Sequence, residues 1–188
     1  MYQHLASLVS YPDAGLFRAL DDCIQALAPE VPEAATLLEH FREVARELGQ
    51  DGLEETYIQV FEMQAEAALY IGHQLFGEDW RRGTFMACLK ERYRECGFSC
   101  GAELPDHASV ILRFLEVEQP GPEKEELIGD CIAPALHKVL RAIEGKKTPY
   151  DNVVRALLLY LGAGRDGETE TEDLSCRPSS SSLFPILR

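Results

Sequence analysis

The sequence predicts an all-α protein folded as a single-domain helical bundle. Apolar residues recur at helical spacing in almost every segment that has the composition of an ordered protein. Runs that alternate apolar and polar residues, as half-buried strands do, are absent from the sequence. A length of 188 residues suits one core and is short for two. Internal repeats typical of helical solenoids are also absent, so one bundle is expected.

Two one-sided helices are predicted in the N-terminal part of the chain. The first apolar stripe consists of Leu16, Leu20, Ile24 and Leu27, and the second of Leu37, Phe41, Val44 and Leu48. Pro12, Pro29 and Pro32 separate these pieces, because the residue before a proline is pushed out of the α-helical region.

Further helices are expected over residues 53–76, 80–95, 106–118, 123–144 and 150–162, the first with a break near Glu62. One stripe in the fourth of these consists of Ile128, Ile132, Ala135, Val139 and Ile143. Pro134 lies inside that stripe and predicts a kink, because proline lacks a backbone donor and clashes one turn back. The last apolar face consists of Val153, Val154, Leu157, Leu158 and Leu161, and its width predicts a largely buried helix that closes the core.

The composition changes at Gly164, which divides the chain into a helical domain over residues 1–163 and a tail over residues 164–188. The tail is acidic and Ser-rich, with too little apolar area to offset the entropy of ordering, so we expect it to be flexible and dispensable for folding. Its end is apolar again at Leu183, Phe184, Ile186 and Leu187. These residues either dock in a groove of this or a neighbouring molecule, or form a disordered end.

Charge and targeting signals limit the possible partners. The net charge of −14 argues against nucleic acid or an anionic membrane and favours a basic partner, unless it only keeps the protein soluble. No export signal is visible near Met1, and no apolar run approaches the ~18 residues of a membrane span, so no stable membrane insertion is expected. A cytoplasmic location with reduced cysteines follows from this interpretation.

Two local patterns carry possible binding chemistry. Tyr57 and Phe61 are four residues apart and share a helix face beside Glu62, a spacing that most often indicates core packing. Pro105 and Asp106 are typical of a helix start, where proline fixes φ and a carboxylate favours the positive end of the helix dipole.

These patterns lie in two sequence blocks, from Leu53 to Glu62 and from Glu103 to His107, with Arg82-Gly83 and Tyr93 between them. In this order they resemble the delta-subunit branch of the molybdoenzyme assembly chaperones, which have the TorD-like fold. The resemblance covers residues 1–162. It implies a chaperone that binds the N-terminal segment of the catalytic subunit of a nitrate reductase or another molybdopterin oxidoreductase, and that supports molybdenum-cofactor insertion. Phe76 departs from the family, whose delta subunits carry a second histidine there.

The resemblance also implies a peptide-binding site made of Tyr57, Phe61, Glu62, Arg82, Tyr93, Pro105, Asp106 and His107. The apolar face of the client peptide would lie on Tyr57 and Phe61, and its cationic residues would face Glu62 and Asp106. Asp106 would accept hydrogen bonds from the peptide, and His107, titrating near neutrality, would make binding pH-sensitive. The protein would carry no cofactor of its own and act as a monomer or homodimer.

A second hypothesis is a small all-α metal or redox sensor that uses Cys88, Cys96, Cys100 and His107. Structural zinc sites usually show two close ligand pairs, and this sequence has one loose pair, so no metal is expected. Nucleophile elbows, phosphate-binding loops and dinucleotide fingerprints are all absent from the sequence. We therefore expect no catalytic residues and no enzymatic activity.

Overall fold

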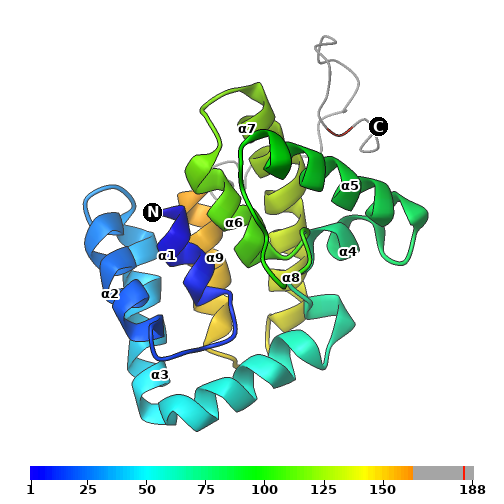
Figure 1. Ribbon diagram of the computed structural model, residues 1–188. Helices are drawn as coiled ribbons and strands as arrows, with labels where there is room; N and C mark the ends of the chain where they lie inside the picture. The colour runs from blue at the N-terminus through cyan, green and yellow to red at the C-terminus, as the bar shows by residue number, and fades with distance from the viewer. Residues whose placement is uncertain (163–183, 185–188) are drawn as a thin grey trace, which may run out of the picture.

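The computed structural model describes residues 1–162 and Phe184, and it confirms the all-α prediction (Figure 1). The α-helices are α1 (Tyr2–Leu8), α2 (Leu16–Leu27), α3 (Pro32–Tyr57), α4 (Ile71–Phe76), α5 (Trp80–Glu95), α6 (Ala108–Val117), α7 (Pro122–Glu126), α8 (Ala133–Ile143) and α9 (Tyr150–Tyr160). The described residues form no strand, only an isolated antiparallel bridge between Tyr70 and His107. None of the described helices is long and apolar enough to span a membrane.

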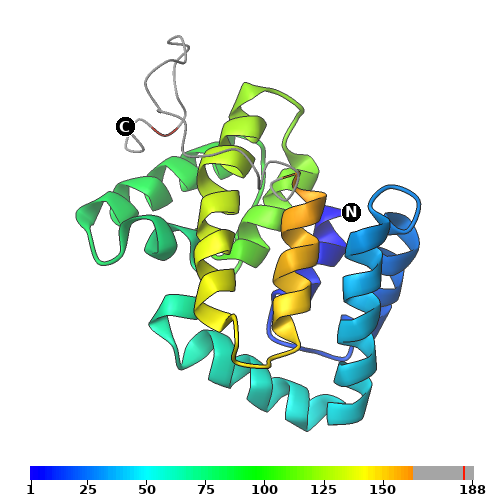
Figure 2. The same cartoon turned by 180° about the vertical axis from the view of Figure 1, so that it is seen from behind.

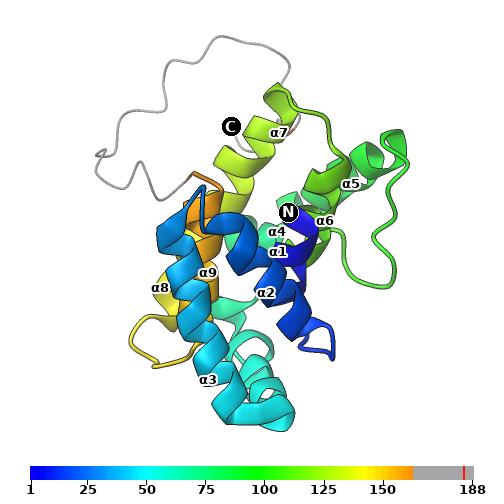
Figure 3. The same cartoon turned by 90° about the vertical axis from the view of Figure 1, so that its left-hand side faces the viewer.

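Helix α9 lies at the centre of the bundle, as its broad apolar face predicts. It packs against α3 and α8. Figure 2 shows it standing between α8 and the first half of α3, with the second half of α3 crossing below both. Figure 3 shows α2 lying beside α3, and α1 packs between α2 and α6. Helix α1, whose Leu5 and Leu8 are buried, was not predicted from the sequence.

The buried face of α3 differs from the predicted stripe. Phe41 is buried as expected, but Val44 and Leu48 are exposed, while the buried neighbours of Phe41 include Ala34, Ala35, Leu38 and Ala45. The alanines on the inner face of α3 have small side chains, and this face packs against α2 and α9. A pattern that counts only large apolar residues does not reveal such a face. The prediction was therefore wrong about the orientation of this helix.

Helix α3 bends at Gly49, which explains why the sequence suggested two separate helices here. Gly49 has φ 68° and ψ −179°, a backbone conformation open almost only to glycine. The bend is visible at the lower left of Figure 1, where the second half of α3 turns to run under the bundle.

Two π-helical segments lie at the places where the sequence predicted a break near Glu62 and a kink at Pro134. The segment Ile58–Glu62 ends the α3 continuation, which confirms the predicted break near Glu62. The segment Leu127–Ile132 precedes α8 and places Pro134 in the first turn of that helix, where a missing N–H is tolerated. The predicted kink at Pro134 is thus a local change of helix type.

Within the predicted tail, the structure describes only Phe184. Its side chain is fully buried, and its ring lies 5.0 Å from the ring of Phe85 on α5. A truncation after Gly164 would remove this buried aromatic ring. Whether the fold tolerates that loss stays a prediction. The predicted tail residues other than Phe184 lie outside the described part of the chain.

The bend in α3 leads to a prediction for Gly49. The Gly49→Ala substitution should lower the free energy of unfolding by about 1–3 kcal/mol, because the new Cβ meets no atom within 4 Å but the backbone conformation becomes strained. The matched control is Gly83→Ala in the interior of α5, which has equally open surroundings and should raise stability by up to about 1 kcal/mol. Chemical denaturation measures both, and equal effects would contradict the role given to Gly49.

Candidate functional site

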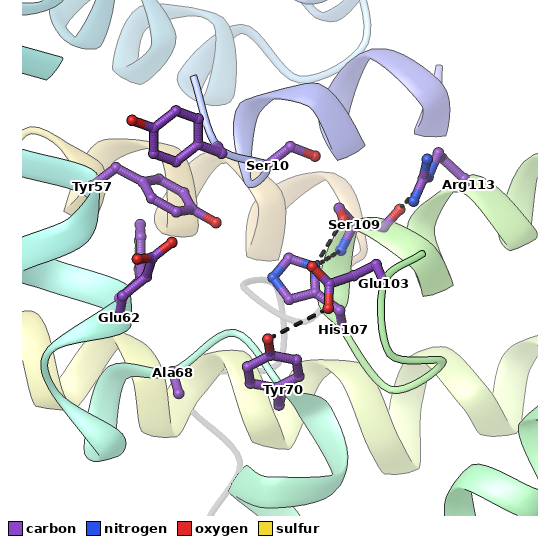
Figure 4. Close-up of a pocket in the computed structure, with 11 residues that line it drawn as sticks. Ser10, Tyr57, Glu62, Ala68, Tyr70, Glu103, His107, Ser109 and Arg113 are labelled. Atoms are coloured by element: carbon purple, nitrogen blue, oxygen red, sulfur yellow. Dashed lines mark hydrogen bonds between the residues drawn. The ribbon is translucent and has the colours of Figure 1, made fainter. Parts of the chain in front are cut away.

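A cavity of about 390 Å³ opens between α3, α6 and the loops that follow α1 and precede α6 (Figure 4). Its lining residues come from five segments of the chain and are Ser10, Tyr11, Tyr57, Phe61, Glu62, Ala68, Tyr70, Glu103, His107, Ser109 and Arg113. Four of the eight predicted site residues are among them. The structure therefore brings Tyr57, Phe61, Glu62 and His107 together around one space.

Tyr57 and Phe61 form the apolar wall of the cavity and belong to the core at the same time. Each is 4% exposed, and their rings make edge contacts with Tyr150 at 5.8 and 5.1 Å. The Tyr57 hydroxyl donates to the backbone carbonyl of Val9 at 3.2 Å. Truncating either ring would open the core, so a loss of binding without a loss of stability is not expected from these positions.

Carboxylates give the cavity a negative field. Glu62 and Glu103 are exposed at its edge, and the Tyr70 hydroxyl donates to Glu103 at 3.4 Å. The pKa of Tyr57 is raised, first by burial and then by the charges of Glu62, Tyr70 and Glu103. Arg113 is the cation that lines the cavity, at the far side from Glu62 (Figure 4). A cationic group of a ligand is therefore favoured near Glu62 and Glu103.

His107 caps α6 and faces the cavity with its other ring nitrogen. Its Nδ1 accepts from the backbone N–H of Ser109 at 3.2 Å and lies 2.8 Å from the Ser109 hydroxyl. Because a backbone N–H can only donate, the ring proton is on Nε2. Figure 4 shows this nitrogen directed toward the side of the cavity formed by Tyr57 and Glu62. His107 thus offers one hydrogen-bond donor to a ligand.

The pKa of His107 is lowered, which disfavours the charged ring, and pH-sensitive binding stays a prediction. Burial is the largest cause, and Arg113 acts in the same direction, against the charges of Glu103 and Asp106. The helix also begins at Ala108 rather than at residue 106, because His107 is the capping residue. The hydrogen bond that Nδ1 accepts from the Ser109 N–H likewise favours the neutral ring.

Asp106 is not available to a client peptide, contrary to the prediction. Its side chain is 0% exposed and accepts from Arg82 Nε at 2.8 Å. Its backbone carbonyl accepts from the N–H of Ile71 at 2.7 Å, and the guanidinium of Arg82 lies 5.3 Å from the centre of the Tyr70 ring. Arg82 and Asp106 thus hold the loop that carries His107 against the segment that carries Tyr70.

Tyr93 and Pro105 also support the site from behind. The Tyr93 hydroxyl donates to the Pro105 carbonyl at 2.8 Å, and both residues are buried. Burial is the largest cause of the raised pKa of Tyr93. Arg82, Tyr93, Pro105 and Asp106 are absent from the cavity lining. They are positioning residues for the loop.

Seven lining residues were not predicted from the sequence, namely Ser10, Tyr11, Ala68, Tyr70, Glu103, Ser109 and Arg113. Glu103 begins the sequence block from Glu103 to His107, and this position could have indicated that it belongs to the site. Tyr70 reaches the site through the bridge to His107, a long-range pairing that periodicity does not reveal. A second, more apolar groove of about 470 Å³ lies between α3, α8 and α9 and contains none of the predicted residues.

The structure does not assemble the residues of the sensor hypothesis. Within the described part of the chain, no three or more His, Cys, Asp or Glu side chains are grouped so that they could hold a metal ion. His107 Nδ1 is paired with Ser109, and Cys96 lies 3.8 Å from Glu118. Burial is the largest cause of the raised thiol pKa values of Cys88 and Cys96, which disfavours the thiolate form that binds metals.

The Arg82–Asp106 ion pair generates a stability prediction. Arg82→Met should cost about 3–5 kcal/mol in the free energy of unfolding, because it leaves the fully buried Asp106 carboxylate without a counter-charge. The double variant Arg82→Met, Asp106→Asn should recover part of that loss. Urea titrations of both variants test this, and a double variant less stable than Arg82→Met would refute the interpretation.

His107 generates a prediction for pH. Because the pKa of His107 is lower in the folded protein, the unfolded chain takes up a proton at a higher pH than the folded protein does. The contribution of His107 to the free energy of unfolding is therefore complete above the ordinary pKa of about 6.5, and it decreases as the pH falls below that value. His107→Asn retains a capping side chain without this titration, so its stability should vary less between about pH 7 and pH 5. Thermal melts across this range check the difference, and parallel curves for the two proteins would exclude this role of His107.

Comparison with known proteins gives the family. Residues 24–143 match the family described as nitrate reductase delta subunit. The probable nitrate reductase molybdenum cofactor assembly chaperone NarJ of Bacillus subtilis (strain 168) is 30% identical over 116 residues, which is 60% of this chain and 62% of that protein. The match thus spans less than two thirds of the relative's length. Because the family match covers more than half of the sequence, the chain belongs to the nitrate reductase delta subunit family.

Proposed function

We propose that this protein is a system-specific cytoplasmic chaperone for the catalytic subunit of a nitrate reductase or a related molybdopterin oxidoreductase. It binds the N-terminal segment of that subunit and supports molybdenum-cofactor insertion and assembly. Membership of the delta-subunit family and the similarity to a probable cofactor assembly chaperone support this proposal. The protein acts by binding and release rather than by catalysis.

The observation that carries the proposal is the composition of the cavity. It joins an aromatic wall, Tyr57 and Phe61, to the exposed carboxylates of Glu62 and Glu103. A basic amphipathic peptide matches both features, because its apolar side chains fit the wall and its cations fit the edge. The net charge of −14 attracts such a peptide before contact.

Two further features suit a peptide backbone in the cavity. His107 Nε2 donates into the space, where a peptide carbonyl is the natural acceptor. Tyr11 is 46% exposed at the edge of the cavity, and its ring makes an edge contact with Tyr57 at 5.7 Å. Binding that orders such a peptide costs several kcal/mol of conformational entropy, which favours a moderate affinity and release after assembly.

The charge at the cavity edge leads to a binding prediction. Glu62→Gln together with Glu103→Gln should weaken the binding of a synthetic peptide spanning the N-terminal segment of the catalytic subunit by about threefold to thirtyfold, because exposed ion pairs each contribute less than about 1 kcal/mol. The loss should shrink as salt is raised. Isothermal titration calorimetry at low and physiological ionic strength measures both effects.

Two controls separate this site from general electrostatics. Glu43→Gln, on the exposed side of α3, removes a carboxylate without touching the cavity and should leave affinity nearly unchanged. A peptide with its lysines and arginines replaced by glutamine should bind the parent protein and the double variant equally. Equal losses from Glu43→Gln and from the double variant would show that only net charge matters and would rule out recognition at the cavity.

A further inference from the structure

The C-terminal segment contributes one aromatic ring to the core, at a place away from the cavity. Phe184 and Phe85 are both 0% exposed, with ring centroids 5.0 Å apart, and the ring of Phe76 lies 5.8 Å from Phe85 on α5. We call Phe76 and Phe85 the aromatic socket. Rings at these separations attract each other beyond simple burial, so the socket is suited to an aromatic side chain.

Phe184 does not compete for the candidate client site. Neither it nor the aromatic socket contributes to the cavity lining. The alternative in which Phe184 occupies the client groove of its own molecule is therefore wrong. An influence of Phe184 on the cavity therefore requires residues that connect the aromatic socket to the cavity lining.

The structure contains such a connection at Gly72, in the first turn of α4. A Cβ placed on Gly72 would lie 3.0 Å from Phe85 Cδ1, 3.1 Å from Arg82 Cγ and 2.7 Å from Asp106 Oδ2. The socket and the buried ion pair therefore meet at one point with no spare room. Close-packed groups of this kind transmit displacement rather than absorb it.

From Gly72 the connection continues to the cavity wall. Asp106 precedes His107, and Ile71, next to Gly72, donates its N–H to the Asp106 carbonyl at 2.7 Å. The neighbouring Leu69 carbonyl accepts from the N–H of Ala108 at 2.8 Å. Tyr70 and His107, paired by the isolated bridge, both line the cavity. A shift of Phe85 would thus reach two groups that face the client.

We propose that the aromatic socket is an intramolecular binding site for the C-terminal Phe184 and that its occupation holds Tyr70 and His107 in the arrangement that binds the client. Without Phe184, the ring of Phe85 loses a packing partner and moves toward the vacated volume, which loosens the junction at Gly72. Occupation of the socket and binding at the cavity then favour each other, as linked equilibria require. The link to client binding rests on the proposed function, whereas the socket itself does not.

The test uses Phe184→Ala in the full chain, with Phe17→Ala as the matched control. Phe17 is a partly buried phenylalanine on α2, away from α4 and α5, so its removal destabilises the fold without touching the socket. Phe184→Ala should lower the melting temperature by about 5 °C or more and weaken the binding of the client N-terminal peptide by about fivefold or more. Phe17→Ala should lower the melting temperature with little change in affinity.

Rescue in trans separates the socket from its effect on the client. A synthetic peptide of residues 179–188, added in excess to Phe184→Ala, should raise its melting temperature, and the same peptide with alanine at position 184 should not. An unchanged melting temperature in Phe184→Ala, or equal rescue by both peptides, overturns the socket. A higher client affinity, or one lowered no more than in Phe17→Ala, overturns the coupling. If the parent protein fails to bind the client peptide, the proposed function fails, and the melting and rescue results still decide the socket.

Discussion

The buried ion pair between Arg82 and Asp106 is the interaction on which the rest of the candidate site depends. Asp106 is fully enclosed, so its charge is compensated within the fold, by Arg82 at 2.8 Å. That constraint fixes α5 to the loop before α6, and the backbone bonds beside it fix the same loop to the segment before α4. His107 and Tyr70 face the cavity because of this arrangement. Pro105 and Asp106 therefore serve the architecture of the loop, and of the three residues from Pro105 to His107 only His107 lines the cavity.

The aromatic wall shows how one helix face serves both packing and recognition. Tyr57 and Phe61 contact Tyr150 inside the core while their outer edges line the cavity. A site built from core residues is rigid, which reduces the entropy lost on binding. The same feature makes alanine substitutions there uninformative about binding. The exposed residues at the edge, Glu62, Glu103 and Tyr11, are the positions where binding can be changed without opening the core.

The sequence predicted the helical class, the break near Glu62 and four of the residues that line the cavity. The helical class and the break depend on local periodicity, and the four lining residues belong to the two sequence blocks that resemble the chaperone family. The true face of α3 was missed because Ala34, Ala35 and Ala45 share its inner face with Leu38 and Phe41, and small alanines do not stand out in an apolar pattern. Asp106 was misassigned because its partner Arg82 lies 24 residues away in the sequence, and no local pattern reveals that pairing. Phe184 was recognised as part of an apolar end that could dock in a groove, but the sequence alone did not show that its side chain belongs to the core.

The most direct test of the central claim is site-specific photo-cross-linking in the full protein. A photoreactive phenylalanine analogue at Tyr11, which is exposed at the cavity edge, should cross-link to the N-terminal segment of the molybdoenzyme catalytic subunit when the two proteins are co-expressed. The same analogue at His40, in the groove between α3, α8 and α9, should not. Cross-links from position 40 alone, or from position 11 to other parts of the subunit only, would contradict binding of the N-terminal segment at this cavity.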